Sequence, residues 1–187
     1  MKKTIINTLI ILLTLFTLAL HAQDIKIYKT YNDYKNNKYE EGYKLKNYSY
    51  FNKRVKLFLK KGNEKFSMRC NEMWGFDLEG HLFVIARNDD FFPVKLLSKG
   101  DFFYFENGVS HMSIILKNKK SDRTYMGNLA YFSKGLNENI IPIYRVNGRY
   151  SKQYKRYKKE NPQYSTLFEC IKSSHDRWST DKIRKCF

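Results

Sequence analysis

Basic and aromatic side chains alternate over one short segment near the C-terminus of this chain. Basic groups there could neutralise phosphates or other acidic groups, while tyrosine rings could stack on a ligand or line its groove. The candidate binding residues are Tyr150, Lys152, Tyr154, Lys155, Arg156, Tyr157, Lys158 and Lys159. An anionic polysaccharide, a nucleic acid or a membrane surface would fit this chemistry. The more common arrangement, a solvated helix whose tyrosines pack on the domain, is the alternative.

Trp74 is a further candidate binding residue, in the sequence Trp74-Gly75-Phe76. On an exposed loop, Trp74 and Phe76 would stack on a sugar or a base. In the interior they would fill one end of the β structure, with Gly75 allowing a close backbone approach. Burial is favoured, because the neighbouring strands need large apolar residues.

Acidic residues offer a second, enzymatic chemistry. Two carboxylates at a suitable separation can hydrolyse a glycosidic bond, but the sequence does not supply that separation. The candidates are Asp77, Glu79, Asp89, Asp90 and Glu106. The chain contains no G-x-S-x-G motif, which would mark a nucleophilic serine. We therefore expect a non-enzymatic protein, with a small secreted hydrolase acting on nucleic acid or glycan as the alternative.

The sequence predicts no metal ion and no cofactor. Beyond residue 22 the histidines are His81, His111 and His175, far apart and outside any H-E-x-x-H or C-x-x-C pattern. Asp77, Glu79 and His81 alternate and could face one way. A solvated turn accounts for this triplet more simply.

The elements that must position these residues are mostly strands. Apolar residues alternate with mostly cationic ones over 55–60 and 65–70, around a turn at 61–64, which predicts an amphipathic hairpin. A short helix is expected after Thr30, which would cap it. Further candidate strands are His81–Arg87, Val94–Leu97, Phe102–Glu106, Val109–Leu116 and Tyr125–Phe132. Asn107-Gly108 has the residues of a two-residue hairpin turn.

These strands predict a mainly β (α+β) fold, either an antiparallel meander or a partly open barrel. Residues 23–145 would form this β-rich domain, and residues 146–187 a C-terminal helical tail packed on it. Cys170 and Cys186 both lie in the tail, so we pair them as a disulfide and expect Cys70 to be a buried thiol. Pairing of Cys70 with either tail cysteine stays open.

The first 22 residues indicate export. Lys2 and Lys3 precede an apolar run over 9–20, and Ala22 suits a cut before Gln23. The run is short for a bilayer span, so a cleaved signal peptide is expected, with an uncleaved anchor as the alternative. The protein would then work in the periplasm or outside the cell, with no transmembrane segment in the mature chain.

The chain carries 35 Lys and Arg against 18 Asp and Glu, a formal charge of +17. Such a surface attracts polyanions. The abundance of Lys, Asn, Ile, Tyr and Phe is also what an AT-rich coding sequence favours, which is a second explanation of the charge.

The segment Ile27–Tyr34, the Lys-rich hairpin, the Trp74-Gly75-Phe76 element and Phe103-Tyr104-Phe105-Glu106 together resemble a group of uncharacterised small secreted proteins of Bacteroidetes-type bacteria. The resemblance covers residues 27–116. It implies export and a β-rich fold, and it assigns no catalytic residue.

Overall fold

The computed structural model describes residues 23–51, 54–87, 91–116, 129–145, 147–175 and 180–187. The expected signal peptide at 1–22 lies outside them. The elements are β1 (Gln23–Tyr28), α2 (Tyr31–Lys35), β2 (Glu40–Phe51), β3 (Arg54–Lys61), β4 (Glu64–Arg69), η1 (Cys70–Glu72), β5 (Gly75–Leu78), β6 (His81–Arg87), β7 (Phe91–Lys99), β8 (Phe103–Asn107), α3 (Gly108–Ile115), β9 (Ala130–Ser133), β10 (Ile141–Pro142), α4 (Lys152–Glu160), η3 (Pro162–Tyr164), α5 (Ser165–Ser173) and α6 (Asp181–Arg184).

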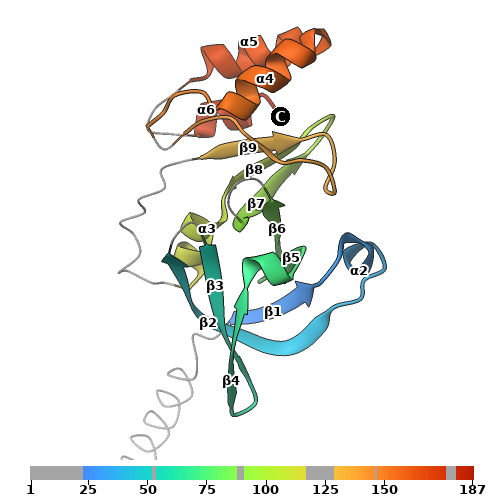
Figure 1. Cartoon of the computed structure of the whole chain (residues 1–187), viewed down its shortest axis with the longest axis vertical. Helices are drawn as coiled ribbons and strands as arrows, with labels where there is room; N and C mark the ends of the chain where they lie inside the picture. The colour runs from blue at the N-terminus through green and yellow to red at the C-terminus, as the bar shows by residue number, and fades with distance from the viewer. Residues whose placement is uncertain (1–22, 52–53, 88–90, 117–128, 146, 176–179) are drawn as a thin grey trace, which may run out of the picture.

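The strands form one open antiparallel sheet in the order β10-β9-β8-β7-β6-β5-β1-β2-β3-β4 (Figure 1). Two meanders, β1 to β4 and β5 to β10, are joined by the pairing of β1 with β5. The sheet curls, so that β3 comes against β7 with η1 between them. The predicted mainly β, antiparallel class is confirmed.

The amphipathic hairpin is confirmed as β3 and β4. Val55, Leu57 and Leu59 are almost completely buried in the main hydrophobic core, which the curled sheet encloses. The β4 partners of Leu57 and Leu59 are less buried, and Phe66, opposite Leu59, remains 39% exposed. The interior of the sheet therefore begins at β3, and β4 is a largely solvated edge.

Residues 109–116 form a helix, not the strand that their apolar character suggests. The side-chain oxygen of Asn107 accepts hydrogen bonds from the backbone N–H groups of Val109, at 3.0 Å, and of Ser110, at 3.3 Å. This is the N-cap of α3, for which asparagine is among the preferred residues. The Asn107-Gly108 pair thus begins a helix instead of turning a hairpin. Of the predicted strand at 125–132, residues 125–128 lie outside the described part, and β9 begins at Ala130.

Gly108 lies where α3 meets β7. A Cβ added there would collide with the backbone carbonyl of Pro93, which has no freedom to move aside. We expect Gly108→Ala to lower the free energy of unfolding by about 2 kcal/mol, as overpacking does. Gly135→Ala is the matched control, because its Cβ would meet only the flexible end of Glu138, at 3.4 Å. Urea denaturation of both variants tests this, and equal stability of the two would contradict it.

Trp74 lies in the interior at the edge of this core, 5% exposed. Its ring packs against Tyr34 of α2 at 4.9 Å and Tyr31 at 5.4 Å, and its backbone N–H donates to the Tyr28 carbonyl. The helix α2 begins after Thr30, whose side chain and backbone form a capping box with Asp33. The strand β1, through Tyr28, and the helix α2, through Tyr31 and Tyr34, therefore hold Trp74 in an aromatic cluster.

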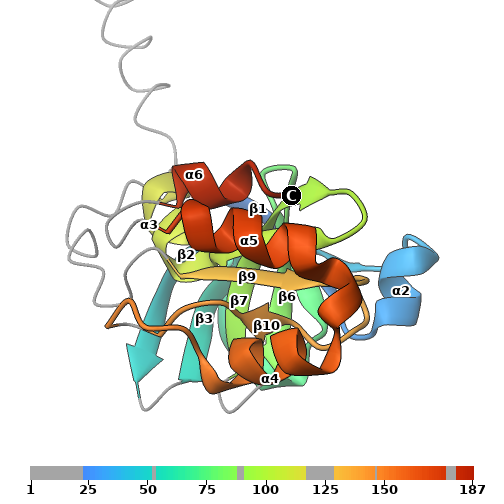
Figure 2. The same ribbon diagram turned by 90° about the horizontal axis from the view of Figure 1, so that it is seen from above.

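The tail is helical and packs on the β10 end of the sheet. Figures 1 and 2 show α4, α5 and α6 gathered there over β9. A second hydrophobic cluster fills the junction, with Phe132 and Tyr104 from the sheet and Tyr154, Phe168 and Ile183 from the helices. The tail therefore has its own apolar contact with the sheet, separate from the main core.

Candidate functional site

The helix α4 contains most of the predicted binding residues, and its start is fixed by Ser151. The Ser151 hydroxyl donates a hydrogen bond to the Pro142 carbonyl of β10 and accepts one from the Tyr154 backbone N–H at 2.9 Å. Serine is a preferred N-cap residue for this reason. The cap therefore anchors α4 to the edge strand of the sheet and sets which face of the helix turns outward.

The tyrosines of α4 face inward. Tyr154 is 2% exposed and stacks on Tyr150, with the ring centroids 5.0 Å apart. Tyr157 packs against Phe132 at 5.2 Å, and Tyr150 also stacks on Tyr144. Burial raises the pKa of Tyr154 well above its ordinary value. These rings pack on the domain, so a stacking role for Tyr154 has no geometric support.

The cations of α4 face outward. Lys152, Lys155, Arg156 and Lys159 are all exposed, at helix positions i, i+3, i+4 and i+7, which place them in one row along the helix. We call this row the basic stripe. Arg156 is ion-paired with Glu160 at 2.8 Å, but its side chain stays 80% exposed. Within the described part of the chain, the three lysines of the stripe have no ion pair.

Two cations of the basic stripe, Lys152 and Lys155, do not stabilise the helix. Lys152–Arg156 and Lys155–Lys159 are like-charge pairs at i,i+4 spacing, each costing a few tenths of a kcal/mol. Lys152 also lies in the first turn, where the helix dipole disfavours a cation, and that turn holds no acidic residue. Arg156, paired with Glu160, and Lys159, in the last turn, favour the helix, so it is Lys152 and Lys155 that helix stability does not explain.

Besides the three inward tyrosines, two predicted binding residues lie outside the stripe. Lys158 turns toward α5, where its ammonium is 3.5 Å from the carboxylate of Glu169. Trp74 lies in the main core, away from the tail, and borders a small cleft of about 150 Å³. The structure therefore does not bring Trp74 together with α4 in one site.

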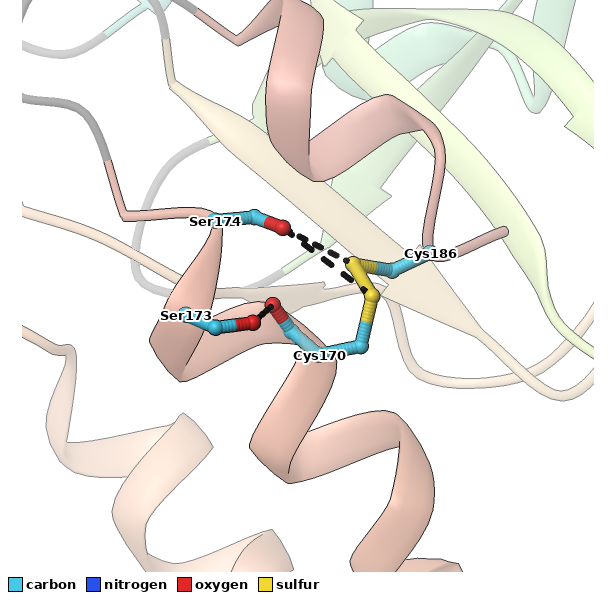
Figure 3. Close-up of a disulfide and its surroundings, with 4 residues drawn as sticks. All are labelled: Cys170, Ser173, Ser174 and Cys186. Carbon is cyan, nitrogen blue, oxygen red and sulfur yellow. Dashed lines mark hydrogen bonds between the residues drawn. A yellow bond between two sulfur atoms is a disulfide. The ribbon is translucent and has the colours of Figure 1, made fainter.

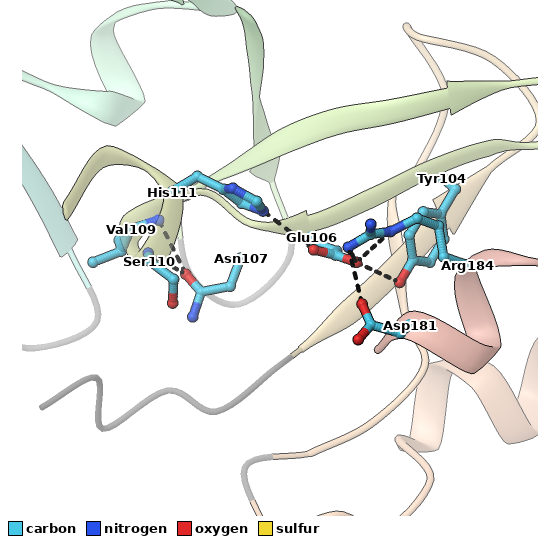
Figure 4. Close-up of polar contacts among 8 residues, drawn as sticks. All are labelled: Tyr104, Glu106, Asn107, Val109, Ser110, His111, Asp181 and Arg184. Carbon is cyan, nitrogen blue, oxygen red and sulfur yellow. Dashed lines mark hydrogen bonds and ion pairs between the residues drawn. The ribbon is translucent and has the colours of Figure 1, made fainter. Parts of the chain in front are cut away.

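A buried polar cluster lies where the sheet meets α3 and α6, centred on Glu106 of β8 (Figure 4). Its Oε1 accepts hydrogen bonds from the Tyr104 hydroxyl at 3.1 Å and from Arg184 Nη2 at 2.8 Å and Nε at 3.1 Å. Its Oε2 lies 3.2 Å from Nε2 of His111 on α3. We call these four residues the Glu106 cluster; it ties the sheet, α3 and α6 together.

The cluster keeps Glu106 ionised although its side chain is only 9% exposed. Burial alone would raise the pKa of the carboxyl. Hydrogen bonds from His111, Arg184 and Thr180 outweigh that effect and lower the pKa to about 2. Burial and the nearby Glu106 charge raise the pKa of Tyr104. A carboxyl with so low a pKa cannot act as a general acid at neutral pH.

The other acidic candidates do not converge on Glu106. Cross-strand partners place Phe76, Phe83, Lys95 and Glu106 in one row across four strands. Asp77 follows Phe76, so it projects to the opposite face and lies about 14 Å away by strand spacing. The Asp77 carboxylate accepts a hydrogen bond from the backbone N–H of Gly80 in the β5–β6 turn. Asp89 and Asp90 fall outside the described residues, so the structure does not bring another of the predicted acidic residues to Glu106.

The disulfide joins Cys170 of α5 to Cys186 after α6, as predicted, with the Cα atoms 5.8 Å apart (Figure 3). The Ser174 hydroxyl lies 3.5 Å from the Cys186 sulfur. Cys70 is a free, buried thiol, and burial raises its pKa to about 12, so it is not nucleophilic. The bond fixes the C-terminal segment against α5.

The described part of the chain groups no three His, Cys, Asp or Glu side chains that could hold a metal ion. None of the helices formed by the described residues has the length and apolar character to cross a membrane. Comparison of the chain with protein-family models, with curated proteins and with solved structures finds no match. The candidate sites therefore rest on their geometry alone.

Proposed function

We propose that this protein is exported and binds an anionic polymer through the basic stripe of α4, without catalysing a reaction. The observation that carries the proposal is the stripe itself, four exposed cations in one row, of which Lys152 and Lys155 repel their neighbours along the helix. A polyanion bound along the row would relieve this repulsion. The disulfide of the tail suits an oxidising compartment, which supports a location in the periplasm or outside the cell.

The test is binding to heparin, duplex DNA and anionic vesicles across a salt series. Contacts by four cations predict that log K falls with log salt with a slope of about −3 for a flexible polyanion. Lys152→Glu/Lys155→Glu should weaken binding to the preferred polymer at least about tenfold at physiological salt. The same variant should be as stable as the parent or slightly more so, because each new Glu gains an i+4 cation, Arg156 or Lys159.

The stability of this variant separates lost binding from lost folding. Lys46→Glu/Lys65→Glu is the matched control, since both lysines are exposed on β2 and β4 and the net charge changes equally. Equal loss of binding in the two variants would show that net charge, and not the stripe, attracts the polymer. No binding of the parent protein at low salt would overturn the proposal and leave coding bias as the source of the charge.

A further inference from the structure

A cleft of about 440 Å³ opens in the tail, next to the C-terminal end of α4. Its volume is in the range of small-ligand pockets. Residues of η3 and the start of α5 line one side, and residues 101–102 and 185–187 line the other, with the disulfide in its wall. We call it the tail cleft. The bond therefore joins two of the segments that line the tail cleft.

Two aromatic rings form a corner in the tail cleft. Phe102 and Tyr164 meet edge to face, with centroids 4.9 Å apart and planes at 89°. Phe102 is held from behind by Phe132. The Lys134 ammonium lies over both rings, 4.5 Å from the centroid of Phe102 and 4.2 Å from that of Tyr164. The Lys134 ammonium therefore occupies the space over both rings, and since Phe102 is only 7% exposed, a ligand in the cleft meets mainly the Tyr164 ring.

Polar side chains complete the lining. Asp101 accepts hydrogen bonds, Gln163 and Thr166 can donate and accept, and Lys185 carries a positive charge. This mixture suits a ligand with several hydroxyl groups and at least one acidic group. An aliphatic or lipid tail would leave these groups unpaired.

The tail cleft continues from the basic stripe. Asn161 follows α4 directly. Gln163 and Tyr164, two and three residues further along the chain, line the cleft. Asn161 also donates to the Tyr157 carbonyl of α4 at 3.0 Å. Lys134, over the Tyr164 ring, also interacts electrostatically with Tyr157 on the inward face of α4, so the cleft lies close to the C-terminal end of this helix. One extended ligand could therefore contact both.

We infer that the tail cleft holds one or two sugar rings of an acidic polysaccharide whose further acidic groups bind the basic stripe. This inference rests on the proposed function and narrows its ligand. The C–H bonds of a sugar ring can pack against the accessible part of the Tyr164 ring. Its hydroxyls pair with Asp101, Gln163 and Thr166, and its acidic group pairs with Lys185.

A nucleobase fits the tail cleft less well. A flat base stacks on ring faces, and two rings at 89° cannot both present a face to it. The geometry thus favours a polysaccharide over a nucleic acid.

The test compares a heparin oligosaccharide with single-stranded DNA of similar charge in titrations of the full chain. Thr166→Trp fills the tail cleft from an exposed position, and Ser165→Trp is the matched control, on the same turn of α5 but outside the lining. Thr166→Trp should weaken heparin binding about tenfold and change DNA binding by less than about twofold. Ser165→Trp should change neither.

The stripe variant Lys152→Glu/Lys155→Glu keeps the two proposals apart. If it binds heparin as the parent does, the proposed function fails. If it loses heparin while Thr166→Trp binds heparin normally, the proposed function stands and the tail cleft inference is overturned. Equal weakening of heparin and DNA binding by Thr166→Trp also overturns it, because the cleft would then not distinguish a sugar.

Discussion

Arg184→Met is expected to lower the free energy of unfolding by about 2 kcal/mol at neutral pH, after allowing for the 44% exposure of the Arg184 side chain. Its guanidinium supplies two of the hydrogen bonds to Glu106, and without it the carboxylate stays buried with less compensation. Chemical denaturation at pH 7 measures the loss. Glu106→Gln/Arg184→Met should recover part of it, because the double variant leaves no buried charge.

Arg184→Met should also change how the free energy of unfolding depends on pH. The folded-state pKa of Glu106, about 2, lies below its ordinary 4.5, so its contribution is complete above pH 4.5 and disappears as the pH falls to 2. Burial persists in Arg184→Met while the main counter-charge is gone, so the folded-state pKa of Glu106 rises toward or above 4.5. The variant should then lose less stability than the parent as the pH falls from 4.5 to 2, and the two stability curves should converge at low pH. Parallel stability curves of variant and parent between pH 7 and 3 would contradict this role of Arg184.

Removal of the disulfide should have an equally large effect. Cys170→Ser/Cys186→Ser should lower the free energy of unfolding by about 3 kcal/mol, since the bond spans 16 residues and restricts the unfolded chain. Denaturation with and without a thiol reductant measures this. The reductant should destabilise the parent to the level of the variant and leave the variant unchanged. A fully reduced parent that unfolds at the original denaturant concentration would show that the bond adds no stability.

Local patterns made part of this fold predictable. The period-two alternation around the turn at 61–64 identified β3 and β4. The cationic, tyrosine-rich segment at 150–159, in the predicted helical tail, contains α4, and the shared place of Cys170 and Cys186 in this tail predicted the disulfide. Each of these signals lies within a few residues of the structure it specifies.

Other elements lack such a local signal. The twelve-residue strand β2 buries only Leu45 fully, so its sequence alternates too weakly to stand out, and pairing with β1 and β3 stabilises it instead. Asn107-Gly108 suits both a hairpin turn and a helix start. The contact of Gly108 with β7 decides between them, and that contact is absent from local sequence.

The site was predictable as a set of residues but not as a surface. The sequence identified the cations of α4, whereas their arrangement opposite the inward tyrosines depends on the Ser151 cap and the packing of Tyr154 on Phe168. The Glu106 cluster combines residues from β8, α3 and α6, and no spacing rule connects Glu106 with Arg184. Export and the resemblance to small secreted proteins stay predictions.

The position of β1 has a consequence for the order in which the chain can fold. The first described strand lies in the middle of the sheet, paired with β2 on one edge and with β5 on the other. Both partners come later in the sequence, and β5 ends only at Leu78. During synthesis or export, β1 would emerge first and keep an unsatisfied edge until residues 75–78 arrive. Such a non-local pairing is slow to form. Until it forms, the unpaired edge of β1 would need protection from pairing with strands of other chains.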